Sequence, residues 1–322
     1  MKSKQSFPFS LLAAAAGFLL LVLLPGDAAE GARRGLSVCG GVIVPSLFPF
    51  LAVSGLSTAL GLSQRLARLL GPLLSRLGIS PYAAAPMLLG LTGGYPVGAS
   101  AVAELVRTGT VSPEDGSKML PWCNNTGPAF LISAAGSAVF GSAKIGAGLY
   151  LCHVLAALTL ALLSRCEKSA GAVSPAAAPE LSFSQVFPDC IRAAAAATVN
   201  ICAFVVFFSV LTALLTAVGV FSALSAGIAL HLGTELQFAK ALLTGLLELG
   251  SGIGAMAGLP PTLRNLALAS FLIGFGGLSV HCQTLSVLSG TNVKCARHFI
   301  GRILHGALSA LYTFLLFTLL RI

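Results

Sequence analysis

The amino-acid sequence predicts an all-α polytopic membrane protein, with about eight to ten membrane segments in two inverted repeats that contain discontinuous helices or re-entrant hairpins. Only 9% of the 322 residues are charged, whereas soluble domains carry about 25%. The mean hydropathy is +0.92, and the apolar runs are about 20 residues long, as in membrane helices rather than barrel strands. Helices are expected because lipid offers no hydrogen-bond partner to unpaired backbone groups.

An apolar stretch from Pro8 to Leu24 follows two lysines, Lys2 and Lys4, at the start of the chain. A cleaved signal peptide is one interpretation. The stretch is longer than the core of about 7–15 residues that is typical of such signals. We therefore favour a retained N-terminal transmembrane helix within residues 1–32.

Residues 33–168 are predicted to form the first repeat, which begins with a short loop that carries Arg33 and Arg34. An apolar segment, an amphipathic interfacial helix, a glycine-broken span, a discontinuous or re-entrant hairpin and a final span follow. In that order they occupy Leu36–Leu60, Gln64–Leu77, Pro81–Val106, Leu120–Phe140 and Ile145–Leu163. Three arginines interrupt the leucines of the amphipathic helix, which indicates that they face lipid headgroups and water.

Two polar motifs interrupt the hydrophobic pattern of this first half. In the first, Gly93 and Gly94 precede Tyr95 and Pro96, a combination that should break a helix. The second motif reads Trp122-Cys123-Asn124-Asn125-Thr126-Gly127-Pro128. Unwound backbone at membrane depth is tolerated only where it is buried in protein or lines a cavity. The two motifs therefore predict a solute site inside the bilayer.

A linker rich in Ala, Ser, Gly and Pro, residues 169–182, separates the halves, and residues 183–322 repeat the same order of parts. The expected segments are Ala193–Val218, a shorter one to Leu232, Phe238–Ala257, Leu263–Leu288 and Ile300–Leu320. The third is predicted to break at Gly250–Gly254 and the fourth at Gly276 and Gly277. The second half thus also has two broken segments.

The distribution of basic residues predicts that the repeats are inverted. With the N-terminus in the cytoplasm, the basic residues fall on the cytoplasmic side, as the positive-inside rule requires. They are Arg65, Arg68, Arg76, Arg165, Lys168, Arg192, Arg264, Lys294, Arg297 and Arg302. The counterpart of the arginine-rich helix, around Phe221–Glu235, has no Lys or Arg. The similar sequences Ala129–Ile132 and Ser270–Ile273 are expected at matching places in the two repeats.

Asn124, Asn125 and Thr126 place two amides and a hydroxyl where hydrocarbon would leave them unsatisfied, so they need partners. One interpretation is that they bind a polar solute, together with N–H groups at the start of the helix after Pro128. The alternative is a helix cap combined with interhelical hydrogen bonds.

Glu248 is flanked by leucines just before the second glycine-rich stretch. A carboxylate at the bilayer centre costs about 3 kcal/mol, which makes it a functional candidate. It could bind a coupling cation, relay a proton or contact solute; the alternative is a structural partner for a helix N-terminus or for a buried histidine. Either Na+ or H+ could couple transport, and no cofactor or resident metal is predicted.

The remaining candidate solute-binding residues are Ser251, Gly276, Gly277, Ser279 and Gln283. On a regular helix Ser279 and Gln283 share one face and His281 does not, whereas an unwound segment could point all three into one cavity. Glu104 stays outside this set, because an interfacial ion pair with nearby Arg107 explains it equally well.

Several function classes find no support in the sequence. It contains no H-E-x-x-H, G-x-S-x-G or Walker motif and no metal-spaced Cys/His set, so no enzyme is predicted. The net charge of +9 is scattered at the ends of apolar runs, so no nucleic-acid partner is expected. The expected partners are a small-molecule solute and the lipid bilayer. Eight cysteines without a C-x-x-C pair indicate reduced thiols.

The motifs Gly94–Gly98 and Cys123–Pro128 resemble those of the YlbJ-type sporulation integral membrane proteins, which belong with the nucleoside-recognition or Gate-domain membrane proteins. The likeness runs from about Arg33 to the C-terminus and is most specific in the first half. It implies a transporter-like core of inverted repeats in a bacterial membrane. It also implies a role in sporulation, namely passage of dipicolinic acid across the outer forespore membrane.

Two alternatives stay open beside a dipicolinic acid transporter. A nucleoside-type carrier would keep the mechanism and change the solute. A non-transporting scaffold of the sporulation envelope would need helix packing but no polar cavity. A homo-oligomer, or a complex with other sporulation membrane proteins, is compatible with all three of these functions.

Overall fold

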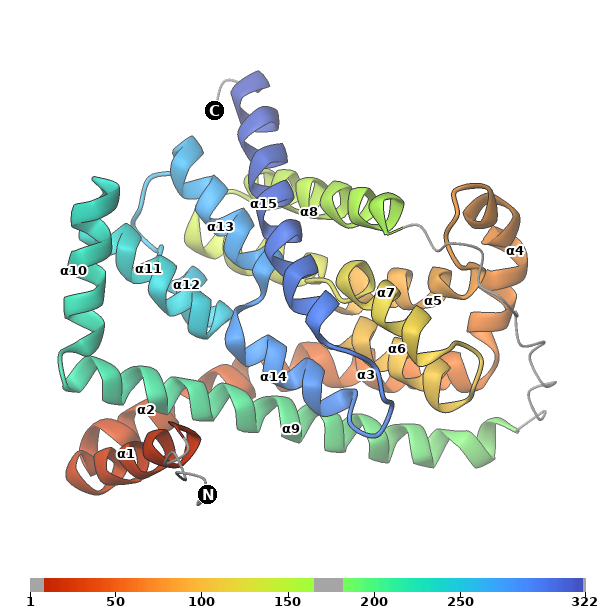
Figure 1. Cartoon of the computed structure of the whole chain (residues 1–322), viewed down its shortest axis with the longest axis horizontal. Coiled ribbons are helices and arrows are strands. Elements are labelled where there is room, and N and C mark those ends of the chain that lie inside the picture. Colours follow the sequence, from red (N-terminus) through yellow and green to blue (C-terminus); the bar gives the residue numbers. More distant parts are fainter. Residues whose placement is uncertain (1–8, 165–181, 321–322) are drawn as a thin grey trace, which may run out of the picture.

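The computed structural model describes residues 9–164 and 182–320, and every regular element within these ranges is a helix (Figure 1). The predicted all-α class is confirmed. Residues 1–8 and all but the last residue of the expected linker lie outside the described ranges, so the structure gives no view of them.

Among the residues that the structure describes, four helical stretches are long and apolar enough to cross a membrane. They are α8 (Ala143–Leu163), α9 (Phe183–Ala217), the α13–α14 stretch (Leu263–Val287) and α15 (Ala296–Leu319). A fifth crossing is formed if Leu11–Leu23 and Pro25–Gly41, which are bent by 100°, count as one span. The chain is a polytopic membrane protein. Its complete spans are fewer than the eight to ten predicted segments, because several of those segments are short helices.

The start of the first repeat differs from the prediction. Helix α1 (Phe9–Leu23) is followed directly by α2 (Pro25–Val38), so the arginines expected in a loop are helical. Glu30 forms ion pairs with Arg33 and Arg34 at 3.0 and 3.4 Å, one helical turn along the same face. These pairs favour helix over loop.

The order of helices repeats between the two halves of the chain. The stretch of α2, a π-helix (Cys39–Ile43) and α3 (Val44–Ala59) corresponds to the single long helix α9. The amphipathic α4 (Leu62–Arg76) then corresponds to α10 (Val220–Leu232). A 3-10 turn (Pro81–Ala83) precedes the broken helices of the first half.

Two broken segments and a final span complete each half. In the first half they are α5 (Ala84–Gly93) with α6 (Val97–Arg107), α7 (Pro113–Cys123) with a π-helix (Phe130–Val139), and α8. In the second half they are α11 (Leu236–Leu247) with α12 (Leu249–Gly254), α13 (Leu263–Phe275) with α14 (Gly277–Val287), and α15. Each half therefore contains two interrupted segments followed by one continuous helix.

The first helical stretches of the two halves lie antiparallel along each other, with α9 running beside α2 and α3 in Figure 1. A Cβ at Gly31 would lie 2.8 Å from the Cα of Val210, and one at Gly55 would lie 3.9 Å from the Cβ of Cys190. A later residue of the α2–α3 stretch therefore contacts an earlier residue of α9. Opposite directions of equivalent spans are what inverted repeats require.

Three helices begin at least seven residues before the start that the sequence predicted. Helix α9 begins at Phe183 rather than near Ala193, because Ser182 forms a capping box with Gln185. Helix α7 begins at Pro113 rather than near Leu120, and the oxygen of Ser112 accepts from the N–H of Asp115. In both cases a serine cap extends the helix into polar sequence. The third difference is at α2, which begins at Pro25 and includes Arg33 and Arg34, the two arginines expected in a loop.

The similar sequences Ala129–Ile132 and Ser270–Ile273 do not occupy matching places, contrary to the prediction. The first lies just after the break that follows α7, whereas the second lies near the end of α13, before its break at Gly276. The equivalence of the halves rests on the order of helices and breaks, not on this short sequence match.

Candidate functional site

The two helix breaks of the first half cross each other at glycines. A Cβ at Gly90 or Gly98 would lie 1.8 or 1.9 Å from the carbonyl oxygen of Cys123, and one at Gly94 would lie 2.9 Å from the amide nitrogen of Gly127. Gly94 also has a φ of +83°, which disfavours a side chain. Backbone meets backbone here, because no side chain separates the two breaks.

The breaks of the second half cross in the same manner. A Cβ at Gly277 would lie 2.8 Å from the carbonyl oxygen of Gly245 and 3.2 Å from the amide nitrogen of Leu249. Gly276 and Gly277 have φ values of +93° and +73°. The α13–α14 break therefore fits against the α11–α12 break, which lies at Glu248.

The α11–α12 break lies at Glu248 and not at Gly250–Gly254, where the sequence predicted it; those glycines are within α12. A Cβ at Gly252 would lie 2.1 Å from the Cα of Gly245. The glycine therefore allows two helices to approach and does not unwind the chain. Extended backbone at Glu248, with φ −140° and ψ 117°, makes the break instead.

Hydrogen bonds join the two crossings into one region. The hydroxyls of Tyr95 and Thr126 both donate to the carbonyl oxygen of Ile273, at 3.0 and 3.3 Å. The amide of Asn124 donates to the hydroxyl of Thr284 at 2.9 Å. Both breaks of the first half thus face the broken α13–α14 stretch of the second half.

Arg302 of α15 lies at the centre of this region and is only 1% exposed. Its guanidinium donates to the carbonyls of Asn124 at 2.8 Å and Pro121 at 3.3 Å, and also to the Tyr95 hydroxyl and the Gly274 carbonyl. No ion pair joins Arg302 to a carboxylate in the described part of the chain. A buried, uncompensated cation thus touches both halves of the protein.

The sequence analysis counted Arg302 among the cytoplasmic basic residues and did not predict its burial. Helix α15 begins at Ala296, four residues before the predicted start of this span, so Arg302 lies further inside the span than predicted. Burial of its charge is tolerated because carbonyl dipoles surround the guanidinium. Its location between Gly301 and Ile303 was the available sequence signal, since an arginine inside an apolar run marks a functional candidate.

Two histidines that the sequence analysis did not select complete the region. The rings of His153 and His305 stack at 4.3 Å, each about midway along the last span of its repeat. His305 accepts from Arg302 at 2.8 Å through Nδ1 and contacts the His153 carbonyl at 3.1 Å through Nε2. The backbone N–H of Thr126 donates to Nε2 of His153 at 3.1 Å. These partners leave Nδ1 of His153 as the protonated nitrogen.

The two asparagines of the second motif differ in their environment. Asn124 is fully engaged, since its oxygen also accepts from the N–H of Ala99 at 3.3 Å. The Asn125 amide donates to the carbonyl of Trp122 at 2.7 Å, but its buried oxygen has no partner among the described residues. Asn124 therefore links helices, whereas Asn125 retains a free acceptor.

Glu248 has the geometry of a helix cap. Its carboxylate accepts from the N–H groups of Gly250 at 2.9 Å and Ser251 at 2.6 Å, at the start of α12. It is 6% exposed, and no cation pairs with it in the ranges that the structure covers. These contacts match the structural alternative raised for this residue.

The remaining candidates lie on regular helix. Gln283 donates to the hydroxyl of Ser279 at 3.2 Å along one face of α14, and both side chains are buried. Nδ1 of His281 lies 3.3 Å from Nε2 of His298. Glu104 and Arg107 form the expected ion pair, at 3.9 Å with both half exposed. Within residues 9–164 and 182–320, no three His, Cys, Asp or Glu side chains gather as metal ligands.

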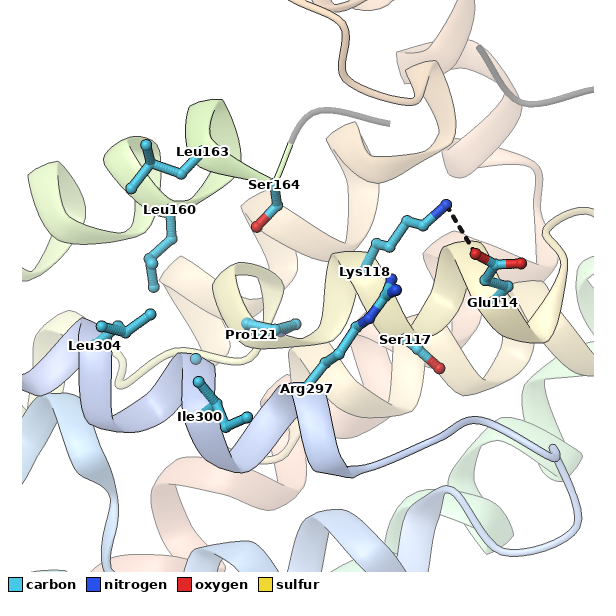
Figure 2. Close-up of a pocket in the computed structure, with 11 residues that line it drawn as sticks. Glu114, Ser117, Lys118, Pro121, Leu160, Leu163, Ser164, Arg297, Ile300 and Leu304 are labelled. Carbon is cyan, nitrogen blue, oxygen red and sulfur yellow. Dashed lines mark ion pairs between the residues drawn. The ribbon is translucent and has the colours of Figure 1, made fainter. Parts of the chain in front are cut away.

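A cavity of about 580 Å³ lies between α7, α8 and the start of α15 (Figure 2). Its polar lining includes Lys118, Glu114 and Arg297, and leucines form much of the remaining wall. Pro121 and Gly301 also line it, and each neighbours the buried region: Arg302 follows Gly301 and donates to the Pro121 carbonyl. The cavity is therefore separated from Arg302 by one layer of residues.

The spans and crossed breaks define an integral membrane protein built around interrupted helices. Residues 41–182 match the model of the Gate family, described as nucleoside recognition. The chain is 26% identical over 318 residues to the sporulation integral membrane protein YlbJ of Bacillus subtilis (strain 168), across 91% of this chain and 78% of YlbJ. No solved structure matches it. The family resemblance that the two motifs indicated is confirmed.

Proposed function

We propose that this protein transports a small anionic solute through the region around Arg302, and that the solute is dipicolinic acid, carried across the outer forespore membrane during sporulation. The resemblance to YlbJ-type proteins supports the sporulation role, since the relative is itself a sporulation integral membrane protein. The chemistry of the buried region supports an anion.

A surplus of buried hydrogen-bond donors carries the proposal. Nε of Arg302, Nδ1 of His153 and Nε1 of Trp122 have no partner within the described chain. Each is a donor in the protonation state that its contacts indicate. A buried donor without a partner costs about 1–3 kcal/mol, and more where the group is charged. A bound carboxylate would supply acceptors and balance the positive charge of Arg302.

The contacts of Arg302 suggest how binding could be linked to movement. The guanidinium is held by carbonyls from α7, the following break and α13. A carboxylate of dipicolinate offers the planar, bidentate acceptor that a guanidinium prefers. On binding it would replace these carbonyls and release contacts between the two halves. Differential contact with a ligand is what shifts a conformational equilibrium.

The test is uptake of radiolabelled dipicolinate into proteoliposomes that contain the purified protein. We expect saturable uptake by the parent and at least about a tenfold loss in Arg302→Gln, because the cation is gone. Arg302→Lys should retain part of the uptake, since it keeps the charge without the bidentate geometry. Arg68→Gln, which removes an exposed arginine of α4, serves as the matched control and should transport normally.

Two outcomes of this test would favour a different function. Folded parent protein that shows no uptake under any proton, sodium or voltage gradient would favour a scaffold role. Inhibition by nucleosides but not by dicarboxylates would favour a nucleoside carrier, a candidate that the nucleoside-recognition match to residues 41–182 supports.

A further inference from the structure

In Figure 1, the arginine-rich helix α4 and its counterpart α10 lie at opposite ends of the long axis of the molecule, and the long span α9 runs between those ends. Because α9 is a membrane span, the two helices lie near opposite surfaces of the membrane. Helix α4 carries Arg65, Arg68 and Arg76 and no acidic residue, whereas α10 has no Lys, Arg, Asp or Glu. Equivalent helices of the two halves therefore present different charges to the two membrane surfaces.

The protein does not neutralise the three positive charges of α4. All three arginines are exposed, and none forms a hydrogen bond or an ion pair with another described residue. The elements packed on α4 are α3, α5 and the 3-10 turn before α5, and none of them contains a charged residue. Residues 165–181, which lie outside the described ranges, contain two basic and two acidic side chains and add no net charge wherever they lie.

The arginines of α4 share one side of the helix with exposed leucines. At about 100° per residue, the three arginines fall within an arc of about 80°. Leu69 and Leu73 lie beside this arc and are 75% and 58% exposed. The opposite side of the helix packs on the protein through Leu74, which contacts a buried cluster that includes Ile79 and Ala83. Cations beside exposed leucines fit the boundary between lipid headgroups and acyl chains.

We propose that α4 is a binding surface for anionic phospholipids, in which the arginines contact phosphate groups and the leucines contact the acyl chains of the same lipids. Guanidinium groups bind phosphate oxygens in a bidentate manner. Each basic residue near an anionic membrane surface favours binding by about fivefold, which corresponds to about 1 kcal/mol. Because α10 lacks these charges, the preference is confined to one leaflet, which the distribution of basic residues assigns to the cytoplasmic side.

The test compares how phosphatidylglycerol and phosphatidylcholine with identical acyl chains bind to the full chain in detergent micelles, by native mass spectrometry. The measured quantity is the ratio of their association constants. The test variant carries three substitutions in α4, namely Arg65→Gln, Arg68→Gln and Arg76→Gln. The matched control removes three exposed arginines that are paired with carboxylates elsewhere, through Arg33→Gln, Arg34→Gln and Arg192→Gln. Both variants lose the same charge, so only its location differs.

We expect the parent protein to bind phosphatidylglycerol at least about tenfold more tightly than phosphatidylcholine, because several basic residues act together. The test variant should bind the two lipids within about twofold of each other, whereas the control should keep the parent ratio. Lysine at all three positions of α4 should preserve most of the preference, since it keeps the charge. Millimolar glycerol 3-phosphate should not displace phosphatidylglycerol, because it has no acyl chain to contact Leu69 and Leu73.

Three results would overturn the lipid surface. They are a parent ratio near one, an equal fall of the ratio in the test variant and the control, and displacement of phosphatidylglycerol by glycerol 3-phosphate, which would indicate a site for soluble phosphate. The assay contains no transported solute, so lipid binding and transport are judged separately. Arg68→Gln alone leaves two arginines on α4 and does not touch the region around Arg302, so it remains a control for uptake.

Discussion

The guanidinium of Arg302 donates a hydrogen bond to the hydroxyl of Tyr95, which joins the last span of the chain to the first helix break. The ring of Tyr95 also lies 5.0 Å from the guanidinium carbon, within the range of a cation–π contact. The same hydroxyl donates to the carbonyl of Ile273. A single tyrosine therefore connects both halves of the protein to the buried cation.

Tyr95→Phe should weaken transport more than it weakens the fold. The substitution keeps the ring beside Arg302 but removes a hydrogen-bond acceptor from the guanidinium and a donor from Ile273. We expect a loss of about 1–2 kcal/mol in stability and a severalfold rise in the KM for dipicolinate, because Arg302 is less firmly positioned. Uptake kinetics and thermal unfolding in detergent measure the two effects.

Tyr312→Phe is the matched control, because Tyr312 is also half-buried and its hydroxyl forms a 2.8 Å hydrogen bond with Thr159 away from the helix breaks. It should lower stability to a similar extent without raising KM. Equal KM changes in the two variants would contradict a specific role of Tyr95.

Gly98→Ala should disrupt the crossing of the first two breaks. The added methyl would lie 1.9 Å from the Cys123 carbonyl oxygen, and backbone cannot yield as a side chain can. We expect a loss of more than about 3 kcal/mol, within the range for severe overpacking and lost backbone contacts. Thermal unfolding and the yield of monodisperse protein are the readouts.

The same glycine-to-alanine change at Gly227 should have the opposite effect on stability. Gly227 is inside α10, and no atom of a neighbouring element lies within 4 Å of the position that the added methyl would take. Alanine should therefore stabilise the helix by about 0.5–1 kcal/mol. A Gly98→Ala protein as stable as Gly227→Ala would show that the two breaks are not in contact.

The helix breaks of the first half could be predicted from sequence because their causes are local. Gly94 with a proline two residues later, and Gly127 with a proline directly after it, restrict the backbone wherever the chain folds. Glu248 illustrates the limit of this reasoning. Glycines after it indicated unwinding, whereas Gly252 serves a tertiary contact with Gly245 that no local rule could anticipate.

The central position of Arg302 was not predicted because charge counting treats a basic residue near the start of a span as part of a loop. Its environment is formed by carbonyls from Asn124 and Gly274, which are distant in the chain. Only the folded arrangement brings those acceptors together. His153 and His305 were missed for the same reason, since their stacking follows from the packing of α8 on α15.

Glu248→Ala should destabilise the protein, because two N–H groups of α12 lose their acceptor. Loss of an N-cap costs about 0.5–2 kcal/mol. Glu248→Gln keeps one side-chain oxygen and should recover part of that loss while transport continues. Thermal unfolding, and uptake under separate sodium and proton gradients, distinguish a cap from an ion site. A Gln variant of unchanged stability that no longer responds to either gradient would identify Glu248 as a coupling residue.

Asn124 and Asn125 should respond differently to the same substitution. Asn124→Ala leaves the N–H of Ala99 without its buried acceptor and removes the hydrogen bond donated to the hydroxyl of Thr284, so we expect a stability loss of about 2–3 kcal/mol. Asn125→Ala removes one hydrogen bond to the Trp122 carbonyl and an oxygen that has no partner among the described residues. Its stability loss should be smaller.

Uptake completes this comparison. If the second N–H of the Asn125 amide donates to the solute, Asn125→Ala should reduce uptake severalfold in protein that unfolds at nearly the parent temperature. Asn125→Asp tests the sign of the charge at the same position, since a carboxylate there would repel an anion and should reduce uptake further. Faster uptake of dipicolinate in Asn125→Asp would contradict an anionic solute at this position, and it would shift the proposal toward a neutral or cationic one.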